Sequence, residues 1–204
     1  VSNSAACDQA QFERETRLLK DALAISNGPL VYFSTTSIYD PASQHSPYVR
    51  HKLLMERLLV ESGQTYVVLR LPQVVGLASN PATLTEYLYR SIMSGMPFEV
   101  WRHAHRHLLD VDDVKTVVAA LVVDEASWAQ TFDLLPPYPI TPLEIVTTLE
   151  AITGRRGNYT IADKGSAYVI GDIRNPPAHS VSLVDFDRSY SKRVIEKYYK
   201  GRYD

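Results

Sequence analysis

The chain has 204 residues, enough for one ordinary domain or for one with a small appendage. Its hydrophobic content of 45% and its net charge of -2 are typical of a soluble globular protein and argue against bulk binding to nucleic acid or to an anionic membrane. One cysteine, Cys7, rules out a disulfide within the chain, and no apolar run approaches the ~18 residues of a membrane span. We therefore expect a cytoplasmic protein with no nucleic-acid or membrane partner.

The first part of the chain predicts a helix, a strand, a second helix and a second strand. Residues 8–26 have helical spacing, with Phe12, Leu18, Leu19 and Leu23 expected on the buried side. An apolar strand is expected over 30–34, and residues with hydroxyl side chains follow it directly. Ser46 and Pro47 then begin a helix that Gly63 closes, with an expected core stripe of Leu53, Leu54, Leu58 and Leu59. A second apolar strand over 65–70 completes a βαβ unit with parallel strands.

The second part of the chain predicts shorter and less regular elements. In chain order they are a helix over 82–94, a strand over 98–101, an apolar helix over 114–123 capped by Asp112, a strand over 132–135, a helix from Thr141-Pro142 to about residue 153, a strand over 159–162, a Pro-rich loop over 175–178 and a helical tail over 185–200. Alternating strands and helices predict the α/β class with a parallel sheet. The irregular later segments predict a small lobe over one end of that sheet.

One stretch pairs groups suited to proton transfer. Tyr48 and Lys52 stand four residues apart, so they share a helix face. The strand before that helix ends in the hydroxyls of Thr35, Thr36 and Ser37. A phenol beside an ammonium, facing a hydroxyl-rich strand end, can pass a proton to or from a substrate.

Four segments together resemble the extended short-chain dehydrogenase/reductases, the NAD-dependent epimerase/dehydratase family that acts on nucleotide sugars. These segments are Ser34-Thr35-Thr36-Ser37-Ile38-Tyr39, the Tyr48 to Lys52 pair, Leu69-Arg70-Leu71-Pro72-Gln73-Val74-Val75-Gly76, and Arg106 to Val114. A tyrosine and a lysine at this spacing occur often by chance, but four segments in this order form a specific pattern. The resemblance implies a Rossmann-like doubly wound parallel sheet. It implies dinucleotide-binding segments in residues 1–76, and a substrate lobe over most of 77–204 from which some segments return to the sheet.

The resemblance also implies roles for individual residues. Tyr48 would be the acid/base, Thr35 would share its proton path, and Lys52 would favour the phenolate and hold the nicotinamide ribose. Leu71 and Pro72 would lie against the nicotinamide of NAD or NADP. The substrate side would be formed by Thr36, Ser37, Gln73, Thr83 and Arg106, with Arg106 on the diphosphate. The resemblance further implies a homodimer formed by the helices over 8–26 and 47–63.

Departures from the family pattern narrow the reaction. Sugar dehydratases of this kind follow the catalytic threonine with an Asp-Glu pair, whereas this chain has Thr36 and Ser37. A 3,5-epimerase-reductase would have Cys near position 37, where this chain has Ser37. Epimerisation or reduction of a keto-sugar therefore remains.

The family's N-terminal strand and GxxGxxG turn, which hold the cofactor pyrophosphate, do not occur in this sequence. Ala5-Ala6 matches the end of a later family strand. The sequence is then either a piece of a longer protein or a relative that has lost cofactor binding and is not a catalyst. We expect the first, because Thr35, Tyr48 and Lys52 are all present.

Two other patterns suggest metal chemistry. His103, His105 and His107 alternate as on one face of a strand, but the interleaved arginines would repel a cation, so we expect no metal. Asp110, Asp112 and Asp113 lack the glycine and glutamate of a calcium loop and favour a helix cap.

Overall fold

The computed structural model describes residues 9–77, 80–165, 170 and 172–202. The expectations for Ala5-Ala6 and Cys7 fall outside these residues. The chain forms two compact units. Unit 1 comprises Val1–Leu71, Lys115–Leu134 and Ile170–Leu183, and unit 2 comprises Pro72–Val114, Leu135–Val169 and Val184–Asp204.

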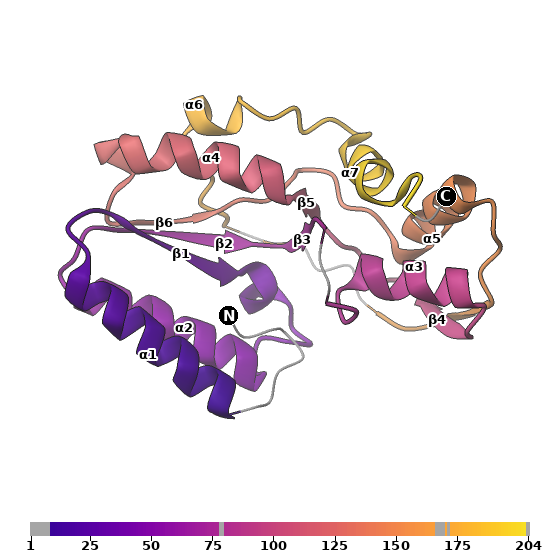
Figure 1. Ribbon diagram of the computed structural model, residues 1–204, viewed down its shortest axis with the longest axis horizontal. Coiled ribbons are helices and arrows are strands. Elements are labelled where there is room, and N and C mark those ends of the chain that lie inside the picture. Colours follow the sequence, from indigo (N-terminus) through magenta and orange to yellow (C-terminus); the bar gives the residue numbers. More distant parts are fainter. Residues whose placement is uncertain (1–8, 78–79, 166–169, 171, 203–204) are drawn as a thin grey trace. The chain divides into compact units, whose positions relative to one another are not determined.

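Unit 1 is built on a three-stranded parallel sheet, as Figure 1 shows. Its strands are β1 (Leu30–Thr35), β2 (Tyr66–Leu71) and β6 (Gln130–Asp133), in the order β1-β2-β6. Residue 30 pairs with residue 66 and residue 35 with residue 71, so β1 and β2 end level with each other. Their carboxyl ends therefore present side chains at one edge of the sheet.

Helices cover both faces of this sheet. The helices α1 (Gln9–Ile25) and α2 (Pro47–Glu61) lie on one face, and the unit 1 part of α4 (Val111–Val123) lies on the other (Figure 1). Short helices η1 (Thr36–Tyr39), η2 (Glu125–Ser127) and α6 (Ala178–Val181) complete the unit. The alternation of elements predicted the parallel sheet, and the helices on both of its faces give the doubly wound arrangement that the family resemblance implied.

The core of unit 1 corrects the predicted helix stripes. Leu19, Met55, Leu59 and Val68 form a buried cluster between the helices and the sheet. Leu18, Leu53 and Leu54 were expected in the core, but they are 51%, 38% and 46% exposed. Apolar spacing alone did not separate neighbouring leucines, because sheet contacts fix the rotation of each helix.

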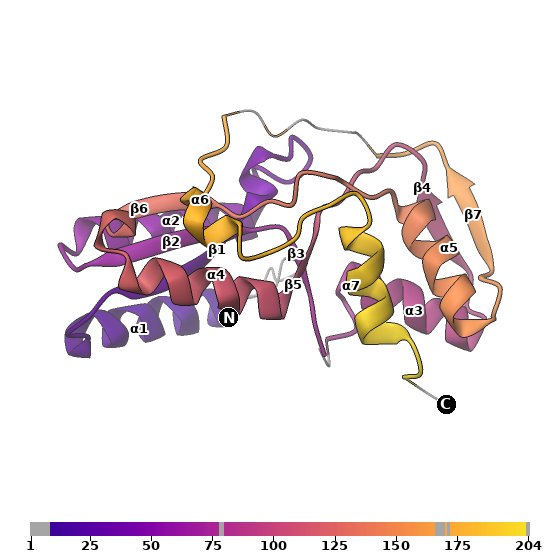
Figure 2. The same cartoon turned by 90° about the horizontal axis from the view of Figure 1, so that it is seen from above.

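The described residues of unit 2 form two small parallel sheets and three longer helices. One sheet pairs β3 (Gln73–Val75) with β5 (Leu108–Asp110), and the other pairs β4 (Phe98–Trp101) with β7 (Tyr159–Ala162). The helices are α3 (Leu84–Ser94), α5 (Pro142–Thr153) and α7 (Tyr190–Tyr199), and Figure 2 shows α5 beside β4.

Local sequence signals explain most helix ends. Ser46 accepts a hydrogen bond from the Val49 amide at the start of α2, and Thr141 forms a capping box with Glu144 at α5. The prediction for α4 was wrong: the helix begins at Val111, and Asp110, not Asp112, accepts the first amide hydrogen bond. Within the described residues, no helix combines the length and apolarity that crossing a membrane requires.

Candidate active site

Thr35 stands at the carboxyl end of β1, directly opposite Leu71 at the end of β2. Its side chain is 6% exposed, and its Oγ1 accepts a hydrogen bond from the Ser37 amide at 3.1 Å. This bond caps the short helix η1, so the hydroxyl of the last strand residue is held in place by the backbone that follows it. The Thr36 Oγ1 donates to the Leu71 carbonyl oxygen at 3.5 Å.

Tyr48 approaches Thr35 from the first turn of α2. The Ser46 cap and Pro47 fix where this helix begins, and they bring Tyr48 near the Thr35 hydroxyl. Burial raises the pKa of Tyr48 above its ordinary value, the neighbouring Thr35 hydroxyl lowers it, and the Glu15 carboxylate raises it. The net result is a raised pKa, so Tyr48 holds its proton more firmly than a free phenol.

Lys52 lies one turn further along α2 and is 2% exposed. Its Nζ donates to Glu15 Oε1 at 2.8 Å, to the Tyr32 hydroxyl at 3.1 Å and to the Phe33 carbonyl oxygen at 3.0 Å. The predicted pair therefore comes with a carboxylate, Glu15 of α1, that the sequence reasoning missed. No spacing signal could reveal it, since Glu15 is separated from Lys52 by 37 positions.

A second buried network supports the strand ends of unit 1. Arg70 of β2 donates from Nε and Nη2 to the two oxygens of Glu56, at 3.0 and 2.7 Å, and from Nη1 to the Tyr39 hydroxyl at 3.0 Å. The Tyr39 hydroxyl in turn donates to Asp133, at 2.9 Å from Oδ1. Ser34, the residue before Thr35, donates to Glu56 Oε1 at 2.5 Å. This network holds the segment on both sides of Thr35 and Thr36 against β2 and β6.

The remaining predicted site residues belong to unit 2. Pro72 and Gln73 follow β2. Gln73 begins β3, and its backbone N–H donates to the His107 carbonyl oxygen at 3.2 Å. The Gln73 Oε1 atom is buried without a hydrogen-bond partner among the described residues. A buried acceptor without a partner is uncommon and points to a donor that arrives with a ligand.

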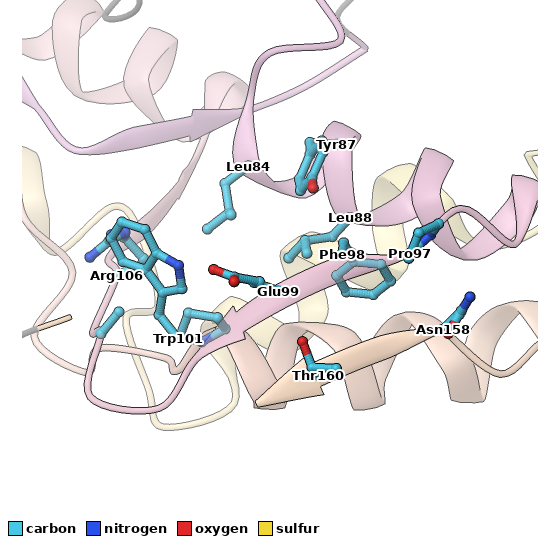
Figure 3. Close-up of a pocket in the computed structure, with 12 residues that line it drawn as sticks. Leu84, Tyr87, Leu88, Pro97, Phe98, Glu99, Trp101, Arg106, Asn158 and Thr160 are labelled. Atoms are coloured by element: carbon cyan, nitrogen blue, oxygen red, sulfur yellow. The ribbon is translucent and has the colours of Figure 1, made fainter. Parts of the chain in front are cut away.

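Unit 2 also contains a cavity of about 620 Å³. Figure 3 shows Leu84 facing Glu99 and Trp101 across it, with Arg106 beside Trp101. Its lining is mainly apolar, with polar groups at a few points; it comprises Leu84, Tyr87, Leu88, Pro97, Phe98, Glu99, Trp101, Ala104, Arg106, Pro142, Asn158 and Thr160. Thr83 stands at the N-cap of α3 beside this lining, although its side chain makes no capping bond. An apolar cavity with a few polar groups is the usual form of a small-molecule site.

Arg106 is positioned by its backbone and one side-chain bond. Its amide donates to the Ile140 carbonyl, its own carbonyl accepts from the Ile140 amide, and its Nη1 donates to the His105 carbonyl at 2.8 Å. The segment is not the continuous strand that alternating histidines suggested, because residues 102–103 form a turn and residues 104–105 have no regular secondary structure. His103 pairs with Asp163 at 2.7 Å, and His107 bonds to the Pro136 carbonyl. Within the described part of the chain, no three His, Cys, Asp or Glu side chains gather as a metal site would need.

The parallel sheet covered on both faces, with hydroxyl and phenol groups at the carboxyl ends of its strands, defines the class of Rossmann-like α/β proteins. A model of the NAD dependent epimerase/dehydratase family matches residues 5–130, more than half of the chain. The chain belongs to this family. No curated protein sequence matches it.

Solved structures with the same fold share little sequence with the chain. MoeE5 in complex with UDP-glucose and NAD is 22% identical, with a TM-score of 0.63 over 82% of this chain and 62% of that one. The UDP-glucuronic acid 4-epimerase of Bacillus cereus with NAD is 18% identical, with a TM-score of 0.68 over 97% and 72%. The UDP-glucose 4-epimerase of Thermus thermophilus with NAD is 16% identical, with a TM-score of 0.66 over 92% and 68%. The chain thus spans less than two thirds of the length of MoeE5.

Proposed function

We propose that this chain carries the proton-transfer and substrate-binding half of an NAD-dependent enzyme that epimerises or reduces a nucleotide-activated sugar. The observation that carries the proposal is that Thr35 stands at the level carboxyl ends of parallel strands, close enough to Tyr48 for its hydroxyl to lower the pKa of that phenol. Ligands of open α/β sheets bind at this edge, so a substrate hydroxyl there would meet both side chains. Membership of the epimerase/dehydratase family supports the same reaction class.

Tyr48 is the acid/base of the proposed reaction. In oxidation of the sugar, its phenolate accepts the proton of a substrate hydroxyl, and in reduction its phenol returns a proton to the carbonyl oxygen. The single hydrogen of the Thr35 hydroxyl is donated either to the phenolate, which lowers the pKa of Tyr48, or to the same substrate oxygen once Tyr48 is protonated. Thr36 and Ser37 supply no carboxylate, so elimination of water has no acid at these positions.

Leu71, Pro72 and Lys52 are the residues that would hold a nicotinamide cofactor. Leu71 is half-buried at the end of β2, and Pro72 follows it, so the two offer an apolar surface for a flat ring. Lys52 supplies a cation that would stabilise the Tyr48 phenolate and could donate a hydrogen bond to a ribose hydroxyl. In the chain by itself, its three hydrogens are donated to Glu15, Tyr32 and the Phe33 carbonyl oxygen. A bound cofactor would take and return the hydride. NAD is the cofactor in the solved structures of MoeE5 and the Bacillus cereus epimerase.

The cavity of unit 2 would take the nucleotide part of the substrate. Arg106 lines it, and a guanidinium suits the oxygens of a diphosphate. Trp101 and Tyr87 offer aromatic faces on which a base can stack. The Gln73 Oε1 atom, which has no partner among the described residues, would accept a hydrogen bond from a hydroxyl of the sugar or ribose.

The proposal is tested with the protein, NAD and UDP-glucose or UDP-glucuronic acid, the nucleotide sugars of related structures. Turnover is followed by resolving the epimers chromatographically and by the absorbance of reduced nicotinamide. In Tyr48→Phe we expect turnover to fall by about a hundredfold or more, because the acid/base is lost. Binding of the nucleotide sugar should change little, because the phenyl ring keeps its packing.

Tyr66→Phe is the matched control, since this tyrosine lies at the far end of β2 from Thr35. Its turnover should equal that of the original chain. If Tyr48→Phe kept full activity, the assignment of Tyr48 would be wrong. If the unchanged protein bound neither NAD nor a nucleotide sugar, the alternative of a non-catalytic relative would replace the proposal.

A further inference from the structure

Glu15 and Lys52 form an ion pair inside unit 1, between α1 and α2. Lys52 Nζ lies 2.8 Å from Glu15 Oε1, and the two side chains are 3% and 9% exposed. An ion pair so far from water costs desolvation energy, and apolar side chains of similar volume would join the two helices at least as stably. Its place one helical turn from Tyr48 suggests a role beyond packing.

Each of the three hydrogens on the Lys52 ammonium group has an acceptor within the chain. An ammonium has three donors, and those of Lys52 go to Glu15, to the Tyr32 hydroxyl and to the Phe33 carbonyl oxygen. The Tyr32 hydroxyl also donates to Glu15 Oε1, at 2.9 Å. Glu15 therefore fixes Lys52 against β1 through a direct contact and through Tyr32.

Glu15 also changes the charge that Tyr48 experiences. Burial and the Glu15 carboxylate both raise the pKa of Tyr48, against the lowering effect of the neighbouring Thr35 hydroxyl. The titratable groups around this site are Glu15 from α1, Tyr32 from β1, and His51, Lys52 and Glu56 from α2. Among them, Glu15 is the anion in contact with the lysine, and His51 Nε2 lies 3.3 Å from its other oxygen.

We propose that Glu15 is a positioning residue for the Tyr48 and Lys52 pair: it holds the lysine against β1 and offsets the lysine charge one helical turn from the Tyr48 phenol. The consequence for turnover rests on the proposed function, whereas the effect of Glu15 on the phenol does not.

The test is a titration of the Tyr48 phenol that requires no ligand. Tyrosines are labelled with fluorine, the Tyr48 signal is assigned by its loss in Tyr48→Phe, and its midpoint is followed by ¹⁹F NMR as the pH rises. In Glu15→Gln the uncompensated lysine favours the phenolate, so the midpoint should move to lower pH. Glu13→Gln, on the exposed side of the same helix, should leave it unchanged.

Glu15→Asp keeps the charge on a shorter stem. Its midpoint should shift in the same direction but less than in Glu15→Gln, and it carries the test if the glutamine variant does not fold. Equal midpoints in the original chain and in the folded variants would overturn the proposal, because a residue that only joins α1 to α2 would not move the phenol titration. A midpoint that moved to higher pH would overturn it as well.

Activity supplies a second, separate readout. If the protein turns over a nucleotide sugar, the acid limb of its pH profile should move to lower pH in Glu15→Gln, in step with the phenol midpoint. A protein that binds neither NAD nor a nucleotide sugar would contradict the proposed function, and the fluorine titration would still decide the role of Glu15.

Discussion

Arg70 is the residue that neutralises the buried Glu56 carboxylate of unit 1. Its guanidinium forms a two-point contact with Glu56, whose side chain is 10% exposed, and it also reaches the Tyr39 hydroxyl. The bonds to Glu56 hold the pKa of Arg70 above its ordinary value, against the effect of burial. Without Arg70, the Glu56 carboxylate would keep only weaker donors such as Ser34.

We expect Arg70→Met to lower the free energy of unfolding by about 3 kcal/mol, because it leaves a buried carboxylate unpaired. The loss is measured by urea unfolding. Adding Glu56→Gln in the same chain should restore much of the stability, since the stranded charge is removed. Arg193→Met, which breaks the exposed contact with Asp187, is the control and should cost much less. A double variant no more stable than Arg70→Met would contradict this account.

The contact between α3 and the end of α7 in unit 2 depends on a buried carboxylate. Glu86 accepts from Arg90 Nε at 2.7 Å and from Arg202 Nη1 at 2.7 Å. Beside it, the Tyr199 hydroxyl donates to Thr85 Oγ1 at 3.0 Å. Burial acts to raise the pKa of Glu86, but the bonds from the two arginines outweigh it and hold the pKa below its ordinary value.

A carboxyl group whose pKa is lowered by folding stabilises the folded state above its unfolded pKa and loses that contribution as the pH falls through its folded pKa. Stability should therefore fall between neutral pH and about pH 3 by more in the original chain than in Glu86→Gln. Urea unfolding at both pH values measures the difference. Glu61→Gln, exposed at the end of α2, should retain the acid sensitivity of the original chain. Equal acid sensitivity in the original chain and in Glu86→Gln would refute the role of Glu86.

The exposed leucines of α1 and α2 bear on how the whole protein assembles. Leu18 and Ile25 on α1 are 51% and 79% exposed, and Leu53 and Leu54 on α2 are 38% and 46% exposed. The two helices lie side by side on one face of the sheet (Figure 1). Apolar side chains exposed on adjacent helices suit a partner surface of the same kind.

We expect a homodimer in which these two helices pack against their copies as a four-helix bundle. Sedimentation should give a dimer for the original chain and a monomer for Leu18→Lys with Leu54→Lys, because four buried charges would face one another in the bundle. Leu183→Lys changes a leucine that is 58% exposed outside both helices, and it should remain dimeric. If the original chain sedimented as a monomer, the homodimer would be ruled out.

Contacts between neighbours in the chain explain what could be predicted from the sequence. The strand over 30–35, the helix from Pro47 and the capping box at Thr141 are set by apolar spacing, by proline and by side chains that bond to nearby amides. The four-residue interval between Tyr48 and Lys52 places them on one helix face in any context. For the same reason, the order of strands and helices was enough to predict a parallel α/β sheet.

Tertiary structure alone decided which of these residues interact. The Glu15–Lys52 pair joins positions 37 apart, and the Tyr39–Asp133 contact joins positions 94 apart. Packing against the sheet, not spacing, buried Leu19 and left Leu18 exposed. The sequence could place Thr35, Tyr48 and Lys52 as candidates because one strand end and one helix turn carry them. It could not reveal Glu15, because the distance between a carboxylate and a lysine on different helices is set only when the two helices pack.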